Sequence, residues 1–188
     1  MMQRHQCLAV LARHITDEIV VATYSSAFEW LELGERSLNY FSVGAMGLDS
    51  SHALGLALGR PDRRVICLQG DGSLLMNLGA LATIAVLNPA NLAILCVDNG
   101  HYGETGYQKS HTSLGVDLEK IAAGSGIKRT RTLASDAELA EGGRMLRDGN
   151  GTAFIVLKVK PDDPPPYKRN MDPASCRVRF RGALLGAG

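Results

Sequence analysis

The sequence predicts an α/β domain with a doubly wound, mainly parallel sheet and helices on both faces. Several apolar segments lack alternating polar residues, which is typical of strands buried on both faces. Helical segments separate these strands, as in a parallel sheet. The 188 residues, 45% of them hydrophobic, suffice for one well-buried domain and are few for two.

In chain order, the first part of the domain begins with a helix, a strand and a second helix that Gly34 is expected to end. A Gly-rich turn after residue 42 then leads into a third helix, which Pro61 and Asp62 stop before the next buried strand. The expected elements are a helix at 6–15, a strand at 19–24, a helix at 25–34, a helix ending at 59 and a strand at 64–69.

The second part continues the alternation of helix and strand. After a Gly-Asp-Gly turn, an apolar helix runs until Asn88 and Pro89 stop it, because proline cannot continue a helix. The expected elements are a helix at 73–88, a strand at 92–98, a helix at 117–126, a strand at 127–133, a helix at 136–149 and a strand at 153–159.

The composition changes beyond Lys160. The segment is first rich in proline and polar residues and then basic at Arg177, Arg179 and Arg181. We therefore divide the chain into a domain at 1–160 and a C-terminal arm at 161–188, which we expect to pack over the domain or over another subunit.

The composition also excludes several classes of protein. The formal net charge is +1, so the chain as a whole has no electrostatic preference for nucleic acid. Arg4, His5, Arg13 and His14 interrupt the apolar N-terminal segment, which argues against a secretory signal, and no apolar run approaches the length of a membrane span. We expect a cytoplasmic protein that binds neither nucleic acid nor a membrane.

The four cysteines show no CxxC spacing, and Cys67 and Cys96 lie within apolar strands. Cysteines in such positions behave as small hydrophobic residues. We expect buried structural thiols rather than disulfides or zinc ligands.

Two polar motifs stand at the ends of neighbouring apolar strands. Gly70-Asp71-Gly72 follows one strand, and Asp98 and Asn99 close the next. Ligands of doubly wound folds bind at the carboxyl ends of strands, so both motifs are expected at the binding edge. Neighbouring strands would bring Asp71 and Asn99 to one point.

These residue types suit a metal ion and a diphosphate. Carboxylate, amide and main-chain carbonyl oxygens are the ligands that Mg²⁺ and Ca²⁺ prefer. Gly70 and Gly72 allow the backbone to approach a bulky anion, and the amides of Gly72 and Ser73 open a helix at its positive end, where phosphate is favoured.

Other interpretations remain possible at this stage. The chain contains neither GxxxxGK[ST] nor GxGxxG after a strand, so P-loop and NAD-binding modules are disfavoured. Gly-Asp-Gly and Asp-Asn-Gly are also ordinary turn sequences, and either one alone favours a turn. Their occurrence together at equivalent strand ends, with 26 residues from Ser73 to Asp98, favours a binding site.

The two motifs resemble the thiamine-diphosphate motif, whose usual form is Gly-Asp-Gly followed after a similar spacing by Asn-Asn. With "VGAMGLDSSHALGLAL" and "DNGHYGETG", they resemble the pyrophosphate domain of sulfopyruvate decarboxylase beta subunits and phosphonopyruvate decarboxylases. The resemblance covers roughly residues 17–160 and also the ending "RVRFRGALLG". It implies a thiamine-diphosphate-binding fold with thiamine diphosphate and Mg²⁺ as cofactors.

The resemblance implies three metal ligands. These are the Asp71 carboxylate, the Asn99 side-chain oxygen and the main-chain carbonyl of His101. Asp98 stands where the motif usually has its first asparagine, which leaves the metal ligand itself intact. We expect this extra carboxylate to pair with a nearby donor or to face away from the metal.

The resemblance also implies the cofactor contacts. Met46 matches the large apolar residue that holds thiamine in a bent conformation, and Gly44 would offer its carbonyl to the pyrimidine amino group. The expected cofactor-binding residues are Gly44, Ala45, Met46, Gly70, Asp71, Gly72, Ser73, Asn99, His101, Tyr102 and Gly103.

The chain is expected to form half of an active site. Thiamine enzymes of this type need a glutamate from a pyrimidine-binding domain, and this chain has no room for a second α/β unit. We therefore expect a hetero-oligomer with a pyrimidine-domain alpha subunit that decarboxylates a 2-oxo acid, sulfopyruvate or phosphonopyruvate, to an aldehyde and CO₂. The alternatives are a non-catalytic cofactor-binding scaffold subunit and an enzyme half that acts on another 2-oxo acid.

The sequence assigns no catalytic residue. A sulfonate or phosphonate group on the substrate would need cationic or hydrogen-bond-donating partners. Lys109 and His111 are the first candidates, His101 and His52 are weaker ones, and an ordinary structural or solvent-exposed role is favoured for each.

Overall fold

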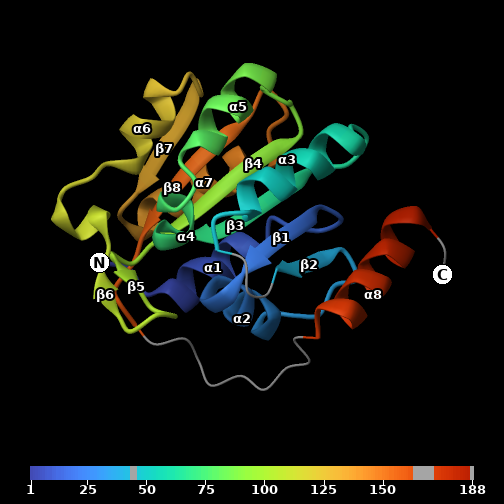
Figure 1. Cartoon of the computed structure of the whole chain (residues 1–188), viewed down its shortest axis with the longest axis horizontal. Coiled ribbons are helices and arrows are strands. Elements are labelled where there is room, and N and C mark those ends of the chain that lie inside the picture. Colours follow the sequence, from blue (N-terminus) through green and yellow to red (C-terminus); the bar gives the residue numbers. More distant parts are fainter. Residues whose placement is uncertain (43–45, 163–171, 187–188) are drawn as a thin grey trace.

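The structure, a computed structural model, describes residues 1–42, 46–162 and 172–186. Its centre is a six-stranded parallel sheet with the strand order β2-β1-β3-β4-β8-β7 (Figure 1). The strands are β1 (Ile19–Thr23), β2 (Asn39–Ser42), β3 (Val65–Gly70), β4 (Leu92–Asp98), β7 (Arg129–Leu133) and β8 (Ala153–Lys158), and β5 (His101–Tyr102) and β6 (Gln108–Lys109) form a separate hairpin.

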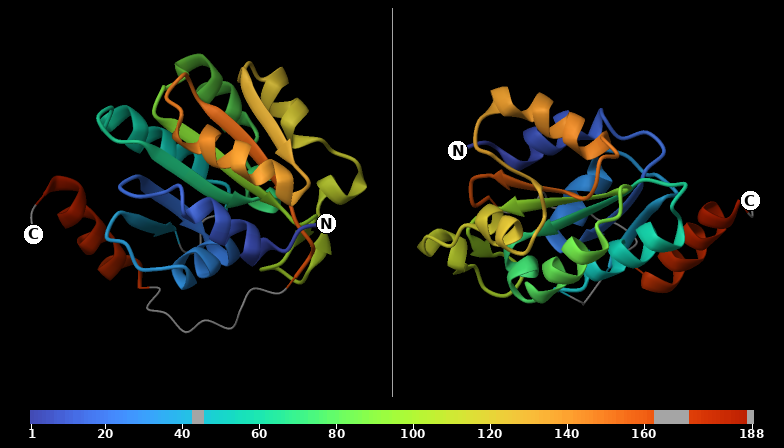
Figure 2. Two further views of the ribbon diagram at one scale, coloured as in Figure 1. Left: turned by 180° about the vertical axis from the view of Figure 1, so that it is seen from behind. Right: turned by 90° about the horizontal axis from the view of Figure 1, so that it is seen from above.

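Helices cover both faces of the sheet (Figure 2). One apolar cluster joins the sheet to α1 (Arg4–Ala12), α2 (Tyr24–Glu32) and α7 (Leu139–Arg147). The other joins it to α3 (Asp49–Gly59), α4 (Asp71–Leu75), α5 (Gly79–Leu87) and α6 (Leu118–Gly124). Along β4, Leu95 belongs to the first cluster and Ile94 to the second, as expected of a strand buried on both faces. The predicted doubly wound α/β fold is confirmed.

The register of β3 and β4 determines where the two polar motifs lie. These parallel neighbours end side by side, with Gly70 opposite Val97. The residues that follow them, Asp71 and Asn99, therefore leave the sheet at the same carboxyl edge.

The strand β2 was not predicted; it has four residues and pairs with β1 at one side of the sheet. Asn39 and Ser42 flank two aromatic residues in this strand, so it lacks the long apolar run that identified the other strands.

The single helix expected at 73–88 is two helices. The backbone of α4 tightens at its end, where the amides of Met76 and Asn77 donate to carbonyls three residues back. The Asn77 side chain also donates to the Gly47 carbonyl at 2.9 Å, so a contact with a distant segment stabilises the turn before α5. This tertiary contact is not visible in the local apolar pattern.

Part of the expected C-terminal arm forms α8 (Pro173–Leu185). Asp172 caps this helix by accepting from the amides of Ala174 and Ser175. The helix packs against β2 through the buried side chains of Cys176 and Phe180. Its three arginines, which the sequence analysis singled out, are exposed. The division of the chain at residue 160 remains a prediction.

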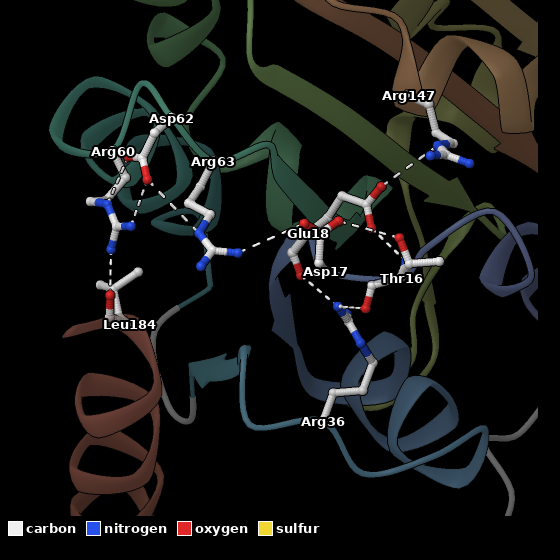
Figure 3. Close-up of polar contacts among 9 residues, drawn as sticks. All are labelled: Thr16, Asp17, Glu18, Arg36, Arg60, Asp62, Arg63, Arg147 and Leu184. Atoms are coloured by element: carbon white, nitrogen blue, oxygen red, sulfur yellow. Dashed lines mark hydrogen bonds and ion pairs between the residues drawn. The ribbon is translucent and has the colours of Figure 1, made fainter. Parts of the chain in front are cut away.

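Charged side chains tie the segments at the amino edge of the sheet together (Figure 3). Arg36 donates to the carbonyls of Thr16 and Glu18 at 2.8 Å, and Arg147 pairs with the Glu18 carboxylate. Arg60 pairs with Asp62 and also reaches the Leu184 carbonyl of α8. These charges are satisfied at the edge opposite the two polar motifs.

All four cysteines, Cys7, Cys67, Cys96 and Cys176, are free and buried, as predicted. In the part of the chain that the structure describes, no helix is both long and apolar enough to cross a membrane.

Candidate functional site

A cleft opens at the carboxyl edge of β1, β3 and β4, where both polar motifs lie. Nine of the eleven residues expected to bind the cofactor line it: Met46, Gly70, Asp71, Gly72, Ser73, Asn99, His101, Tyr102 and Gly103. The other two, Gly44 and Ala45, lie outside the described residues. The fold thus brings together three segments that are far apart in the sequence, although the contacts of these residues with a cofactor remain predictions.

Asp71 is the buried acid of the cleft, with 1% of its surface exposed. Its Oδ2 atom accepts hydrogen bonds from Ser110 Oγ at 2.5 Å and Thr112 Oγ1 at 3.1 Å. Burial raises the pKa of Asp71; the hydrogen bond from Ser110 lowers it, and the neighbouring Asp98 carboxylate raises it. A bound cation would offset this burial and repulsion.

Asp98 is paired, as the sequence analysis expected of an extra carboxylate near an anion. Its carboxylate accepts from Lys158 Nζ, from Thr112 Oγ1 at 2.7 Å and from the Gly100 amide at 3.1 Å. Thr112 has one hydroxyl proton and makes its shorter contact with Asp98, so it links the two buried acids rather than donating fully to both.

The loop after β4 presents the remaining expected metal ligands. Asn99 Oδ1 accepts from the His101 amide at 3.0 Å, and a carbonyl oxygen has a second lone pair available for another partner. Tyr102 lies over the Gly72 turn: a Cβ atom at position 72 would stand 2.6 Å from its ring. A glycine at that position therefore allows the ring and the turn to approach closely.

Buried hydrogen bonds that the sequence did not predict connect the segments around the cleft. Asp49, in the first turn of α3, accepts from Thr23 Oγ1 at the end of β1 and from Ser73 Oγ at 2.8 Å. Ser73 Oγ in turn accepts from the Gly47 amide at 2.9 Å, next to Met46. One carboxylate thus connects three segments that border the cleft. In the sequence, Asp49 is only an acid in a segment rich in Gly, Ala and Leu, and such a local pattern does not predict its hydrogen-bond partners.

Asp49 gives a prediction about stability and pH. Burial raises its pKa to about 6, while the hydrogen bond from Ser73 lowers it. The folded chain thus retains a proton over a range where the unfolded chain, with an ordinary pKa of 3.8, has released it. The contribution of Asp49 to the free energy of unfolding is therefore fully present below pH 4 and is lost as the pH rises through 6. The loss amounts to about 3 kcal/mol.

Asp49→Asn keeps a carbonyl acceptor but cannot titrate. We expect urea unfolding of the chain without cofactor to show this variant gaining stability relative to the parent as pH increases from 4 to 7.5. A stability difference that is constant over this range would contradict the assignment.

One wall of the cleft, which no sequence motif predicted, is formed by α1, the end of β1 and the start of α2. Arg4, Thr23, Tyr24, Ser25 and Ser26 all line the cleft. They lie in α1, at the end of β1 and at the start of α2, segments whose local patterns indicated only secondary structure.

Glu104 lines the cleft too, and it accepts from Ser25 Oγ at 2.6 Å. Of the cations considered for the substrate, His101 lines the cleft, whereas Lys109 and His111 are exposed outside its lining. His52 packs edge-on against the Tyr40 ring, and burial lowers its pKa.

The oxygen groups of the cleft fit Mg²⁺ bound together with a diphosphate. Carboxylate, amide and main-chain carbonyl oxygens are hard ligands of the kind Mg²⁺ takes beside phosphate oxygens and water. Among the described residues, no three His, Cys, Asp or Glu side chains are grouped so as to hold a metal ion. A metal ion here would share its coordination between Asp71, neighbouring oxygens and a ligand.

Comparison with known proteins decides the family. The model of the thiamine pyrophosphate enzyme C-terminal TPP binding domain matches residues 21–157. The chain belongs to this family. Thiamine pyrophosphate is another name for thiamine diphosphate, so the resemblance found in the sequence is confirmed, and with it a thiamine-diphosphate-binding domain.

Similar proteins and a solved structure agree with this assignment to the family. Sulfopyruvate decarboxylase subunit beta of Methanococcus maripaludis is 34% identical over 96% of this chain and 97% of its own length. Sulfopyruvate decarboxylase of Methanosarcina acetivorans is 38% identical over 97% of this chain but only 47% of its own length. Phosphonopyruvate decarboxylase of Streptomyces viridochromogenes is 35% identical over 87% of this chain and 41% of its own length. The crystal structure of benzoylformate decarboxylase from Polynucleobacter necessarius shares the fold, with a TM-score of 0.73 and 22% identity over 87% of this chain and 34% of that one.

Proposed function

We propose that this chain is the diphosphate-binding subunit of a thiamine-diphosphate- and Mg²⁺-dependent decarboxylase that acts on sulfopyruvate or phosphonopyruvate. One observation carries the proposal: the buried Asp71 and the adjacent Asn99 share one cleft in a chain that matches a thiamine-diphosphate-binding domain. A turn without a ligand would not need to bury a carboxylate at the binding edge of the sheet.

Each group of the cleft has a proposed part. Asp71, Asn99 and the His101 carbonyl would hold Mg²⁺, while the amides of Gly72 and Ser73 would donate to the diphosphate. When bound, thiamine diphosphate supplies the electron sink for loss of CO₂ from a 2-oxo acid. The residues of this chain would fix the cofactor, balance its charge and, through the Met46 side chain, pack against its rings.

The lengths of the relatives support a partner subunit. This chain covers nearly all of the Methanococcus protein, whose name describes a beta subunit, but about half of the Methanosarcina protein, whose name describes the whole decarboxylase. The part of the longer protein outside this match is the natural source of a pyrimidine-binding domain. We propose that a separate alpha subunit provides that half and that the cofactor binds between the two chains.

The names of the relatives suggest the substrate class. Sulfopyruvate and phosphonopyruvate are both 2-oxo acids that carry a second acidic group. Arg4 and His101 are the basic residues in the lining of the cleft. Lys109 and His111 lie outside this lining, which leaves His101 as the candidate from the sequence for a contact with the second acidic group.

The test is reconstitution with the partner subunit. We expect the complex, supplied with thiamine diphosphate and Mg²⁺, to release CO₂ and an aldehyde from sulfopyruvate or phosphonopyruvate much faster than from pyruvate, and each chain alone to be inactive. Activity of the isolated chain would contradict the shared active site. A complex that binds cofactor but decarboxylates no 2-oxo acid would support the non-catalytic scaffold instead.

A further inference from the structure

We propose that Arg4 binds the terminal phosphate of thiamine diphosphate and that Glu29 is the residue that positions it. This inference rests on the proposed function, since it concerns the same cofactor. Arg4 lies in α1, before the segment at 21–157 that matches the family domain, yet it lines the cleft. The match to the family therefore gives it no role.

The guanidinium of Arg4 is held in a fixed position within the protein. Only 4% of the side chain is exposed, and Nε pairs with Glu29 Oε2 at 2.7 Å. Nη2 donates to the Asp162 carbonyl at 3.1 Å. These contacts use two of the five N–H donors of a guanidinium, so a single arginine can bind them and an anion together.

The cleft with its ligand would carry excess negative charge, which the Arg4 guanidinium would balance. A diphosphate carries more negative charge than one Mg²⁺ balances, and the carboxylates of Asp71 and Glu104 in the lining add to the excess. Histidine side chains gain and lose their charge within the physiological pH range, whereas an arginine guanidinium stays charged. Arg4 is thus the permanent positive charge of the lining.

The start of α2 strengthens the case for phosphate. Tyr24, Ser25 and Ser26, the first turn of this nine-residue helix, line the cleft together with Arg4. Thr23 stands at the N-cap position, but its hydroxyl donates to Asp49, and the helix has no side-chain cap. The positive end of α2 and the guanidinium therefore border the same space, an arrangement that favours a multiply charged phosphate.

The alternative role for Arg4 is structural, as an ion pair that joins α1 to α2. The two roles separate when thiamine diphosphate is compared with thiamine monophosphate, which lacks the terminal phosphate. We propose calorimetric titration of both ligands with Mg²⁺ into the full chain in complex with its partner subunit. If the role of Arg4 is structural, its replacement should change the affinities for both ligands alike. If Arg4 contacts the terminal phosphate, its replacement should change only the affinity for thiamine diphosphate.

The test variant replaces Arg4 and Glu29 together by glutamine, because the double change removes the ion pair without leaving a buried charge unpaired. We expect a loss of roughly 10- to 100-fold in affinity for thiamine diphosphate, the effect of one charge-assisted contact, and less than about threefold for the monophosphate. Should this variant fail to fold, Arg4→Lys retains the charge balance and is expected to lose roughly 3- to 10-fold for the diphosphate alone.

Arg64→Gln is the matched control. This arginine is partly buried, but it donates to carbonyls at the amino edge of the sheet, so its loss should leave the ratio of the two affinities unchanged. An unchanged ratio in the Arg4 variant would overturn the inference, as would a raised KM for the 2-oxo acid with unchanged cofactor affinity. Failure of the parent complex to bind thiamine diphosphate would instead refute the proposed function.

Discussion

Replacing Asp71 with alanine is expected to abolish Mg²⁺-dependent binding of thiamine diphosphate, with a loss of more than about 100-fold in affinity. Outer-shell partners of metal ligands already contribute about 10- to 100-fold to metal affinity, so a direct carboxylate ligand should contribute more. The effect should be large because this carboxylate is buried at the cleft and accepts from Ser110 and Thr112, which hold it in place.

Calorimetric titration of thiamine diphosphate with and without Mg²⁺ measures this effect, first with the chain alone and then with its partner. Asn99→Ala should weaken binding in the same direction. Asp62→Ala is the control, because Asp62 pairs with Arg60 at the opposite edge and should not affect the cofactor. If the Asp71 variant binds as tightly as the parent, Gly-Asp-Gly is only a turn in this chain.

The Asp71 variants also separate binding from folding. Burial raises the pKa of Asp71, so the ionised carboxylate is unfavourable in the folded chain without a cation. Asp71→Asn keeps an oxygen acceptor for Ser110 and should fold as stably as the parent while failing to bind cofactor. Loss of binding by a fully folded variant would assign the effect to the ligand rather than to the fold.

The sequence predicted best the elements whose signal is local. The strand β4 is a continuous apolar run, and its bounds match the expected strand at 92–98. The strand β2 was missed because four residues that are half polar carry no such signal. The break between α4 and α5 depends on the bond from Asn77 to Gly47, 30 residues away, so only the folded chain shows it.

The same distinction applies to the candidate site. Asp71 and Asn99 were predictable because each directly follows a recognisable strand. Asp49 bonds to residues that line the cleft and Arg4 lines it directly, and their partners, Ser73 and Glu29, are 24 and 25 residues away in the sequence. Nothing in the local sequence marks a buried acid or arginine as part of a network, since that property arises from tertiary packing.

The pair formed by Asp98 and Lys158 leads to the second large effect, an asymmetric one on stability. Only 2% of the Asp98 side chain is exposed, whereas Lys158 is 36% exposed. Lys158→Met would leave a buried carboxylate without its cation, which we expect to cost about 2 to 3 kcal/mol of unfolding free energy. Asp98→Asn leaves a lysine that can reach solvent, so we expect it to cost less than about 1 kcal/mol.

The double variant decides whether the lysine compensates for the departure from the usual Asn-Asn motif. Asp98→Asn restores the residue that the thiamine-diphosphate motif usually has, and an amide needs no cation. We therefore expect Asp98→Asn to rescue Lys158→Met, with a coupling of about 2 kcal/mol between the two changes in urea unfolding. Simple additivity would show that Thr112 and the Gly100 amide suffice to stabilise the Asp98 carboxylate. Because the pair joins β4 and β8 at the residue before Asn99, a positive result would mean that this chain accommodates an acid beside an anionic cofactor by supplying a counter-charge from the neighbouring strand.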